Sequence, residues 1–205
     1  MNEGRTNSFV NHGVPVHAEE SRTGAVCTNK SGESRIVLAA KGFVVIVDPL
    51  TERNVQLFFP AGNREYPYAS FSDSLGYFYT GAGRMFMMLD PFRESFVYYE
   101  TVGYSAELLS FSFEENAEKD EIYFTAYPTC HLYKFNRVSK QTVLVTRLDS
   151  RQMYPSHLAL GKDGWLYAGV GTERKTIVAY HLANGELRSL VPEEQRTRGM
   201  GVVYR

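Results

Sequence analysis

The feature of this chain that most limits its fold is a short pattern that recurs four times at a nearly constant interval. In each copy an apolar, strand-like stretch runs into a polar turn, and the equivalent turn residues are Asp48, Asp90, Asn136 and His181. They lie 42, 46 and 45 residues apart. A period in the mid-forties made of short strands and turns is typical of a β-propeller, whose blades are four-stranded antiparallel sheets around a channel. We therefore predict an all-β protein with about four blades.

A second motif and the turn residues support the same division. Tyr79–Gly81, Phe124–Ala126 and Tyr167–Gly169 are similar strand ends, spaced by 45 and then 43 residues. Asp163-Gly164 and Asn184-Gly185 are hairpin signals, because Asp or Asn before Gly tolerates the positive φ that tight turns require. Helical spacing is not sustained anywhere along the chain, which favours strands throughout.

The repeat separates an N-terminal segment, residues 1–22, from the predicted blades in residues 23–205. The blades are expected at approximately residues 23–60, 68–101, 106–147 and 156–192, with the start of a fifth blade at 199–205. Within the third blade, the charge-rich residues 114–121 are predicted to form a solvated loop.

The number of blades leaves two arrangements open. Four blades and a fragment could close as a small ring, with Ser8–Val10 helping at the seam. We expect instead that the chain is the N-terminal part of a ring of seven or eight blades. An open arc of this kind would expose sheet faces and edges, so self-association is expected if the propeller is incomplete.

Composition limits the classes of partner. The chain of 205 residues is 43% hydrophobic, which suits a folded domain, and its formal net charge is −1. This charge gives no electrostatic reason to expect nucleic acid or an anionic membrane as a partner. No apolar stretch approaches the roughly 18 residues needed to cross a bilayer, and residues 1–13 show no secretory signal. We therefore expect a cytoplasmic protein.

Motifs for metals, cofactors and nucleophiles are not found in the sequence. Cys27 and Cys130 form no CxxC pair and lie in strand-like surroundings, so we predict two structural thiols rather than a disulfide. There is no HExxH motif, acidic calcium loop or GxSxG elbow, and Gly81–Arg84 is predicted to be a hairpin turn rather than a phosphate loop. No metal site and no cofactor are expected.

Propeller topology predicts where a ligand would bind. The connections between blades and the turns between each blade's second and third strands lie on one face of the disc, at the channel mouth. Tyr, His and Arg recur in both sets. The first set contains Arg64, Tyr66, Tyr68, Tyr104, Glu107, Arg151, Tyr154, His157, Arg196 and Arg198, and the second contains Arg84, Tyr127, Thr129, His131, Glu173, Arg174 and Lys175.

These residue types indicate a chemistry. Tyr and His can act as general acids or bases, and Arg binds a carboxylate through two parallel hydrogen bonds. An Arg or a protonated His can also stabilise the negative charge that develops when a proton is removed beside a carboxylate. Because aromatic rings also offer flat faces to sugar rings, we predict a uronate-containing saccharide as the ligand.

Each candidate has a structural alternative. His157, directly before Leu158–Leu160, is the favoured functional histidine, whereas His131 begins a predicted strand and is at least as well explained by a backbone hydrogen bond. Tyr127 and Tyr154 each precede a proline, so packing against a turn explains them equally well.

The stretches Tyr127–Phe135 and Lys162–Gly171 resemble repeats of bacterial propellers of the quinoprotein and lactonase-like type. They are also similar to propeller polysaccharide lyases, including the ulvan lyases, and the resemblance extends over residues 23–205 as a repeat pattern. In the ulvan-lyase-like group, His and Tyr at the channel mouth carry out β-elimination while Arg neutralises the uronate carboxylate. The resemblance implies His131, His157 and Tyr154 as catalytic residues. It implies Arg174 or Arg198 as the neutralising residue.

The leading hypothesis is a propeller that recognises an acidic oligo- or polysaccharide and cleaves it by β-elimination, as a polysaccharide lyase. The predicted substrate-binding residues are Tyr127, Arg84, Tyr104, Arg174 and Arg198. Two alternatives remain open: a non-catalytic module that binds a protein or carbohydrate, and a metal-dependent lactonase-type hydrolase. The second is less well matched, because the acidic and Asn metal ligands of gluconolactonases have no clear counterparts here.

Overall fold

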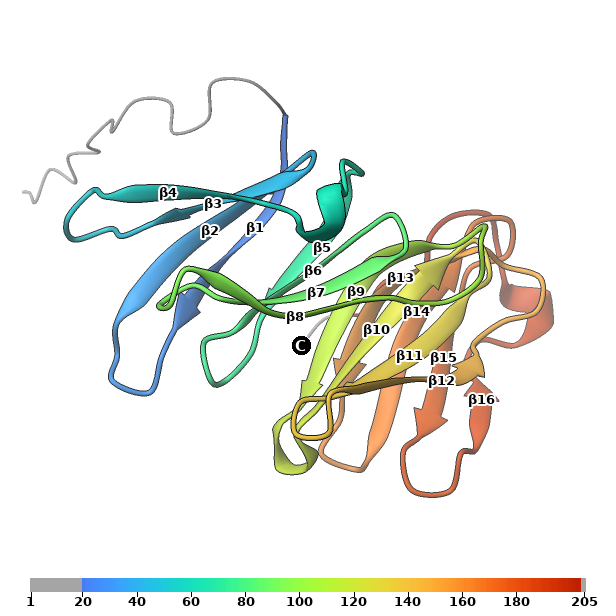
Figure 1. Ribbon diagram of the computed structural model, residues 1–205. Coiled ribbons are helices and arrows are strands. Elements are labelled where there is room, and N and C mark those ends of the chain that lie inside the picture. The colour runs from blue at the N-terminus through green and yellow to red at the C-terminus, as the bar shows by residue number, and fades with distance from the viewer. Residues whose placement is uncertain (1–19, 204–205) are drawn as a thin grey trace, which may run out of the picture.

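The computed structural model describes residues 20–203, and within this range sixteen strands form four separate antiparallel sheets of four strands each (Figure 1). Each sheet is a meander in which consecutive strands pair. The structure is thus the predicted β-propeller, with one sheet per blade. The predicted N-terminal segment, including Ser8–Val10, lies almost entirely outside the described residues.

The strands of each blade follow chain order. Blade one contains β1 (Ser21–Thr28), β2 (Ser34–Ala40), β3 (Phe43–Val47) and β4 (Asn54–Phe58), and blade two contains β5 (Pro67–Ser72), β6 (Phe78–Ala82), β7 (Met85–Asp90) and β8 (Ser95–Thr101). Blade three contains β9 (Leu108–Asn116), β10 (Glu121–Tyr127), β11 (His131–Asn136) and β12 (Gln141–Arg147). Blade four contains β13 (Tyr154–Leu160), β14 (Trp165–Gly171), β15 (Thr176–His181) and β16 (Leu187–Ser189). Three short 3-10 helices are η1 (Pro60–Gly62), η2 (Ala117–Lys119) and η3 (Glu193–Gln195).

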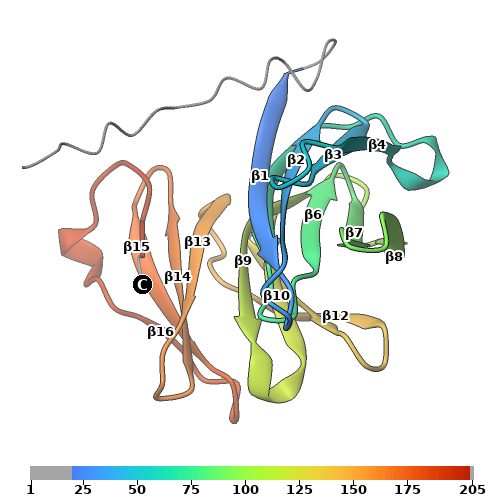
Figure 2. The same ribbon diagram turned by 90° about the vertical axis from the view of Figure 1, so that its left-hand side faces the viewer.

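The first strands of the blades form the inner row of the arc. β1 contacts β5, β5 contacts β9, and β9 contacts β13, so neighbouring blades meet most closely along these four strands. The sheets follow one another in chain order from blade one to blade four, as the two views show (Figures 1 and 2). The inner row therefore defines the same two faces for all four blades.

Three apolar layers between the blades hold the arc together. Side chains alternate along each strand, so one sheet contributes to the layers on both of its sides. In β6, for example, Phe78 packs toward blade one and Tyr79 toward blade three. The layer between blades two and three is mostly aromatic, and the rings of Phe86 and Phe124 stack with centroids 4.6 Å apart. These layers fix the position of each blade relative to the next.

The predicted solvated loop at residues 114–121 is shorter than expected, since residues 117–119 are exposed in η2 but most of the flanking residues belong to strands. β9 continues to Asn116, Glu114 is buried, and Glu121 already belongs to β10. The charges are tolerated because they are paired: Glu115 accepts hydrogen bonds from Ser74 and from Arg137. The sequence predicts a loop here because the partners of these charged side chains lie in other turns and cannot be recognised from the local sequence.

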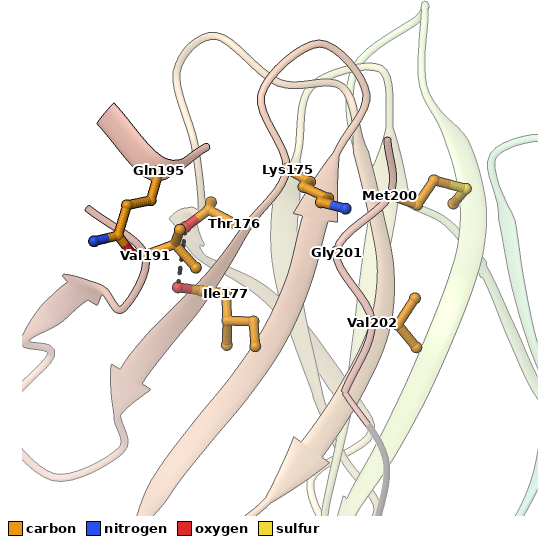
Figure 3. Close-up of a pocket in the computed structure, with 8 residues that line it drawn as sticks. All are labelled: Lys175, Thr176, Ile177, Val191, Gln195, Met200, Gly201 and Val202. Atoms are coloured by element: carbon orange, nitrogen blue, oxygen red, sulfur yellow. Dashed lines mark hydrogen bonds between the residues drawn. The ribbon is translucent and has the colours of Figure 1, made fainter. Parts of the chain in front are cut away.

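The last described residues lie against blade four. Gly199 N donates to Thr172 O at 2.7 Å, and Ser156 Oγ donates to Gly201 O at 2.9 Å. A side chain at Gly201 would overlap the backbone of Thr176 and Val170, so only glycine allows this close approach. Figure 3 shows this segment beside a pocket of 260 Å³ that Ile177 of β15 also lines. That residues 199–205 begin a fifth blade stays a prediction.

Candidate functional site

The two predicted sets of loops do lie on one face. Asn63, between β4 and β5, donates from Nδ2 to Ala82 O at the β6–β7 turn, at 3.0 Å. Val102, after β8, donates its N–H to Arg84 O in that same turn, at 2.8 Å. In blade four, Lys175 N donates to Thr197 O at 2.8 Å. The connections between blades are therefore hydrogen-bonded directly to the turns between the second and third strands.

Four aromatic side chains of blades two, three and four meet at the inner strands on this face, and we call them the aromatic platform: Tyr68, Phe111, Tyr127 and Tyr154. Tyr68 of β5 stacks on Phe111 of β9 with centroids 5.0 Å apart. The ring centroids of Tyr127 and Tyr154 lie 4.5 Å apart. The ring of Phe111 makes an angle of 60° with that of Tyr127 and of 86° with that of Tyr154. Tyr68 is 38% exposed, so part of its ring remains available to a ligand.

Cationic side chains from blade one extend this surface. The Arg22 guanidinium of β1 lies 5.0 Å from the ring centroid of Tyr66 and 5.6 Å from that of Tyr68. Lys41 Nζ also lies 5.0 Å from the Tyr66 ring. A cation over the face of a tyrosine is attracted by the ring's negative π-face. The platform therefore combines flat aromatic faces with positive charge.

Tyr154 is poorly suited to act as a base in this setting. Its hydrogen bond with Tyr127 raises its pKa, and burial and the neighbouring tyrosines act in the same direction. A tyrosine must lose its proton before it can accept one from a substrate, and a raised pKa makes that state rarer. The arrangement instead favours a role for Tyr127 and Tyr154 in packing and ligand contact.

A second polar group surrounds the buried carboxylate of Glu107, and we call it the Glu107 cluster: Glu107, Thr129, His131 and Tyr133. His131 Nδ1 lies 2.6 Å from Oε1, which also accepts from Thr129 Oγ1. Oε2 accepts from Tyr133 Oη at 2.8 Å and from the Tyr104 backbone N–H at 2.7 Å. All four donors thus converge on one side chain that is 0% exposed.

These contacts favour the ionised form of Glu107. Burial raises the pKa of Glu107, but the hydrogen bonds from Thr129, Tyr104, Tyr133 and His131 outweigh it and hold the pKa below its usual value. An ionised carboxylate only accepts hydrogen bonds, so the proton between it and His131 must reside on Nδ1. In neutral His131 the other ring nitrogen, Nε2, is then free to accept a proton.

The connection before Glu107 is shaped by Gly103. This residue has φ +77°, and a Cβ built on it would overlap Glu107 Oε2. Any other residue would have to displace the carboxylate from its donors. Arg84 reinforces the same connection by donating from Nη2 to Gly103 O at 2.8 Å, so this predicted ligand-binding residue is partly used by the protein's own backbone.

The structure separates two of the three predicted catalytic residues, His131 and Tyr154. His131 pairs with Ala126, which packs in the layer between blades two and three, whereas Tyr127 reaches Tyr154 on the opposite side of the blade-three sheet. His157 lies on β13, with Nδ1 3.0 Å from Ser156 Oγ. His131 and Tyr154 therefore belong to two different sites.

The remaining predicted ligand-binding residues are also dispersed. The Tyr104 ring is 60% exposed and lies 5.6 Å from the His131 ring, so it belongs with the Glu107 cluster. Arg174 forms an ion pair with Glu193 in the outer part of blade four, and Arg198 is exposed in the segment after η3. No role in a shared pocket follows for these arginines from their positions alone.

Sequence reasoning missed four residues that define the sites. Glu107 was placed on the correct face but given no role, and Phe111, Arg22 and Lys41 were not singled out. The alternation Leu109, Phe111, Phe113 along a predicted inner strand is a signal that could have drawn attention to Phe111. Nothing local marks Arg22, because its tyrosine partners belong to the next blade.

The chain was compared with known proteins. No protein-family model matches it, and no curated protein shows significant similarity to it. Among solved structures it is similar to a streptogramin B lyase, with a TM-score of 0.66, 14% identity, and coverage of 85% of this chain and 56% of that one. It is also similar to the WD40 repeats of RRP9, with a TM-score of 0.69, 13% identity, and coverage of 88% and 54%.

A third similar structure is the extracellular domain of a two-component system protein of B. thetaiotaomicron, with a TM-score of 0.64, 15% identity, and coverage of 86% of this chain and 23% of that one. This chain thus spans about half or less of each of these proteins. At such identities the similarity shows the fold alone, and the neighbours have diverse functions. The protein is a β-propeller. Within residues 20–203, none of the helices has the length and apolar character needed to span a membrane.

Proposed function

We propose that this propeller binds an acidic, uronate-containing saccharide on the aromatic platform. The observation that carries the proposal is the Arg22 guanidinium held over Tyr66 and Tyr68 beside the stacked ring of Phe111. Tyrosine faces contact the apolar faces of sugar rings, and a nearby guanidinium can bind a carboxylate on the same ring. An ulvan-lyase-like ligand class is consistent with this combination.

Binding rather than cleavage is the function that the geometry supports best. Elimination needs a base and a charge-neutralising cation on the same substrate. Arg22 lies over the platform, but the tyrosine there has a raised pKa, and His131 lies on the other side of blade three. A propeller can present a ligand-binding surface without catalysis, as a scaffold.

A β-eliminating polysaccharide lyase remains the second candidate. It is favoured by the Glu107–His131 pair, which leaves Nε2 of neutral His131 able to take a proton. The fold similarity to a streptogramin B lyase is compatible with lyase chemistry on such a scaffold. In this reading His131 is the base, and the saccharide would have to reach the Glu107 cluster beside Tyr104.

The binding proposal is tested by calorimetric titration with oligogalacturonate and with a neutral oligosaccharide of equal length. We expect binding of the acidic ligand only, weakened about fivefold or more by Tyr68→Ala, since one aromatic contact contributes about 1 kcal/mol. Tyr99→Ala is the matched control, because Tyr99 is 51% exposed on the outer strand β8. Equal affinities for the two variants would contradict the proposal.

Cleavage is measured separately, by the ultraviolet absorbance of unsaturated uronate products. The second candidate predicts product formation that is lost in His131→Ala. Binding without any product would leave the protein as a saccharide-binding propeller.

A further inference from the structure

Outside both sites, arginine side chains gather around one carboxylate at the outer part of blade four. The connection between β12 and β13 and the segment around η3 enclose a hollow of 590 Å³, which Arg147, Arg151 and Arg196 line together with Asp149 and Glu193. Arg174, from the β14–β15 turn, approaches Glu193 from blade four. Four arginines therefore face two acidic side chains, an excess of two positive charges.

Glu193 is the centre of this group. Its Oε1 lies 3.0 Å from Arg174 Nε and 3.8 Å from Arg151 Nη1, and its Oε2 lies 2.9 Å from Arg196 Nη1. The three guanidinium groups come from three separate connections of the fold. Such convergence on one carboxylate is the arrangement by which arginines recognise carboxylate, sulfate or phosphate groups.

Arg196 and the turn that carries Arg174 are held by contacts that do not involve the Glu193 carboxylate, while Arg174 Nη2 also donates to the backbone oxygen of Glu193. Arg196 donates from Nε to Val191 O at 3.1 Å, and Arg147 donates from Nε to Asp149 O at 3.1 Å. The turn that carries Arg174 is fixed by the buried side chain of Gln152, whose Oε1 accepts the N–H groups of Thr172, Glu173 and Arg174 at 2.8, 3.0 and 3.2 Å. Arg196 and the Arg174 turn would therefore keep their positions if the Glu193 carboxylate moved aside.

Glu193 is the part of the group that can most easily be replaced. It begins the three-residue helix η3, which has no side-chain cap, and its side chain is 52% exposed. Ion pairs at this exposure exchange with solvent ions at little cost. Arg196, which is 15% exposed and also donates to Val191 O and Ser189 Oγ, is thus more firmly held than the carboxylate that it contacts.

We propose that this arginine group is an oxyanion-binding site, in which Glu193 occupies the place of a carboxylate or sulfate group of an external acidic ligand. The intramolecular carboxylate competes with that ligand and lowers its apparent affinity. The site lies on the same face as the aromatic platform, since its connections belong to the two loop sets described above. The identity of the ligand as an acidic saccharide rests on the proposed function, but the oxyanion site itself does not.

The test removes the internal competitor. Glu193→Gln should bind oligogalacturonate, and inorganic sulfate as a minimal probe, about fivefold or more tightly than the unmodified protein. Glu194→Gln is the matched control, because it makes the same charge change one residue away on an exposed side chain. A long-range effect of charge alone would alter both variants equally, and that result would overturn the proposal.

Two further measurements separate the possible failures. Arg151→Gln, at a side chain that is 78% exposed, should weaken sulfate binding without affecting folding. Sulfate binding that is the same in Arg151→Gln and in the unmodified protein would also refute the site. If instead Glu193→Gln gains affinity for sulfate but Tyr68→Ala leaves oligogalacturonate binding unchanged, the oxyanion site stands and the proposed function fails.

Discussion

Replacing Glu107 by Gln tests a buried polar cluster at the connection between blades two and three. Gln is nearly isosteric with Glu, but it has one acceptor oxygen and one donor NH₂ group where the carboxylate accepts four hydrogen bonds. The Tyr104 N–H can only donate, so the amide oxygen must take the Oε2 position. The amide NH₂ group then faces Thr129 and His131, and His131 must shift its proton from Nδ1 to Nε2 to accept from it.

The magnitude follows from the change in hydrogen-bond type. Hydrogen bonds to a charged group contribute about 1.5–3 kcal/mol each and neutral ones about 0.5–1.5 kcal/mol, while the neutral side chain avoids the desolvation of a buried charge. A net loss of about 2 kcal/mol in the free energy of unfolding is expected. For a chain of this size that corresponds to a decrease of about 4–8 °C in Tm.

The assay combines thermal unfolding by circular dichroism with ¹⁵N NMR of the histidine side chains. Glu118→Gln is the control, because Glu118 is exposed in η2 and the substitution is chemically identical. If Glu107→Gln lowers Tm no more than Glu118→Gln, and the His131 tautomer is unchanged, the reasoning about the Glu107 cluster is refuted.

The pH dependence gives a second measurement on the same pair. Because the folded-state pKa of Glu107 is lowered, its ionised form contributes stability that is present above the unfolded-state pKa, about 4.3. That contribution is lost as the pH falls through the lower folded-state pKa. The stability difference between the unmodified protein and Glu107→Gln should therefore shrink with acidification below about pH 4, and a difference independent of pH would contradict the assignment of an ionised carboxylate.

Three other predictions follow from described contacts. Gly103→Ala should lower the free energy of unfolding by clearly more than Gly62→Ala in chemical denaturation, because both glycines have positive φ but only a Cβ at Gly103 overlaps another group, Glu107; equal losses would mean that the close approach is unimportant. Arg137→Met should cost about 3–5 kcal/mol in chemical denaturation, since the buried guanidinium pairs with Asp73, Glu115 and Asp120; a loss of less than about 1 kcal/mol would argue against this. Burial raises the pKa of the Cys27 thiol to about 11 and that of Cys130 to about 12, so a thiol reagent at pH 8 should modify both only after unfolding, and rapid reaction of the folded protein would disprove their burial.

Much of the fold could be predicted because its information is local. Each of the four predicted blade ranges overlaps one observed sheet, since alternation of apolar residues and short turns act over short stretches of chain. Asp163-Gly164 and Asn184-Gly185 lie in hairpin turns as predicted, with both glycines at positive φ. The prediction for residues 114–121 was wrong where charged side chains find partners on another turn, as Glu115 does with Arg137.

The candidate site was predictable only in its position. The two loop sets lie on one face as predicted, because propeller topology sends them to the same end of the blades, whereas ligand binding there stays a prediction. Which residues group together on that face could not be predicted, because the direction of a side chain depends on strand register. β13 has a register shift between Pro155 and His157, which interrupts the simple alternation and prevents the direction of His157 from being counted from Tyr154.

The sequence by itself determined the β-propeller class, the approximate blades and the face that carries Tyr, His and Arg, because a period of short strands and turns is written along the chain. Only the tertiary structure decided that Glu107 bonds His131, that Arg22 lies over Tyr68, and that Arg151, Arg174 and Arg196 converge on Glu193. Apart from the pair Arg196 and Glu193, which are three residues apart, each of these contacts joins separate strands, turns or connections. Their geometry is set by how the blades pack together, which no local pattern records.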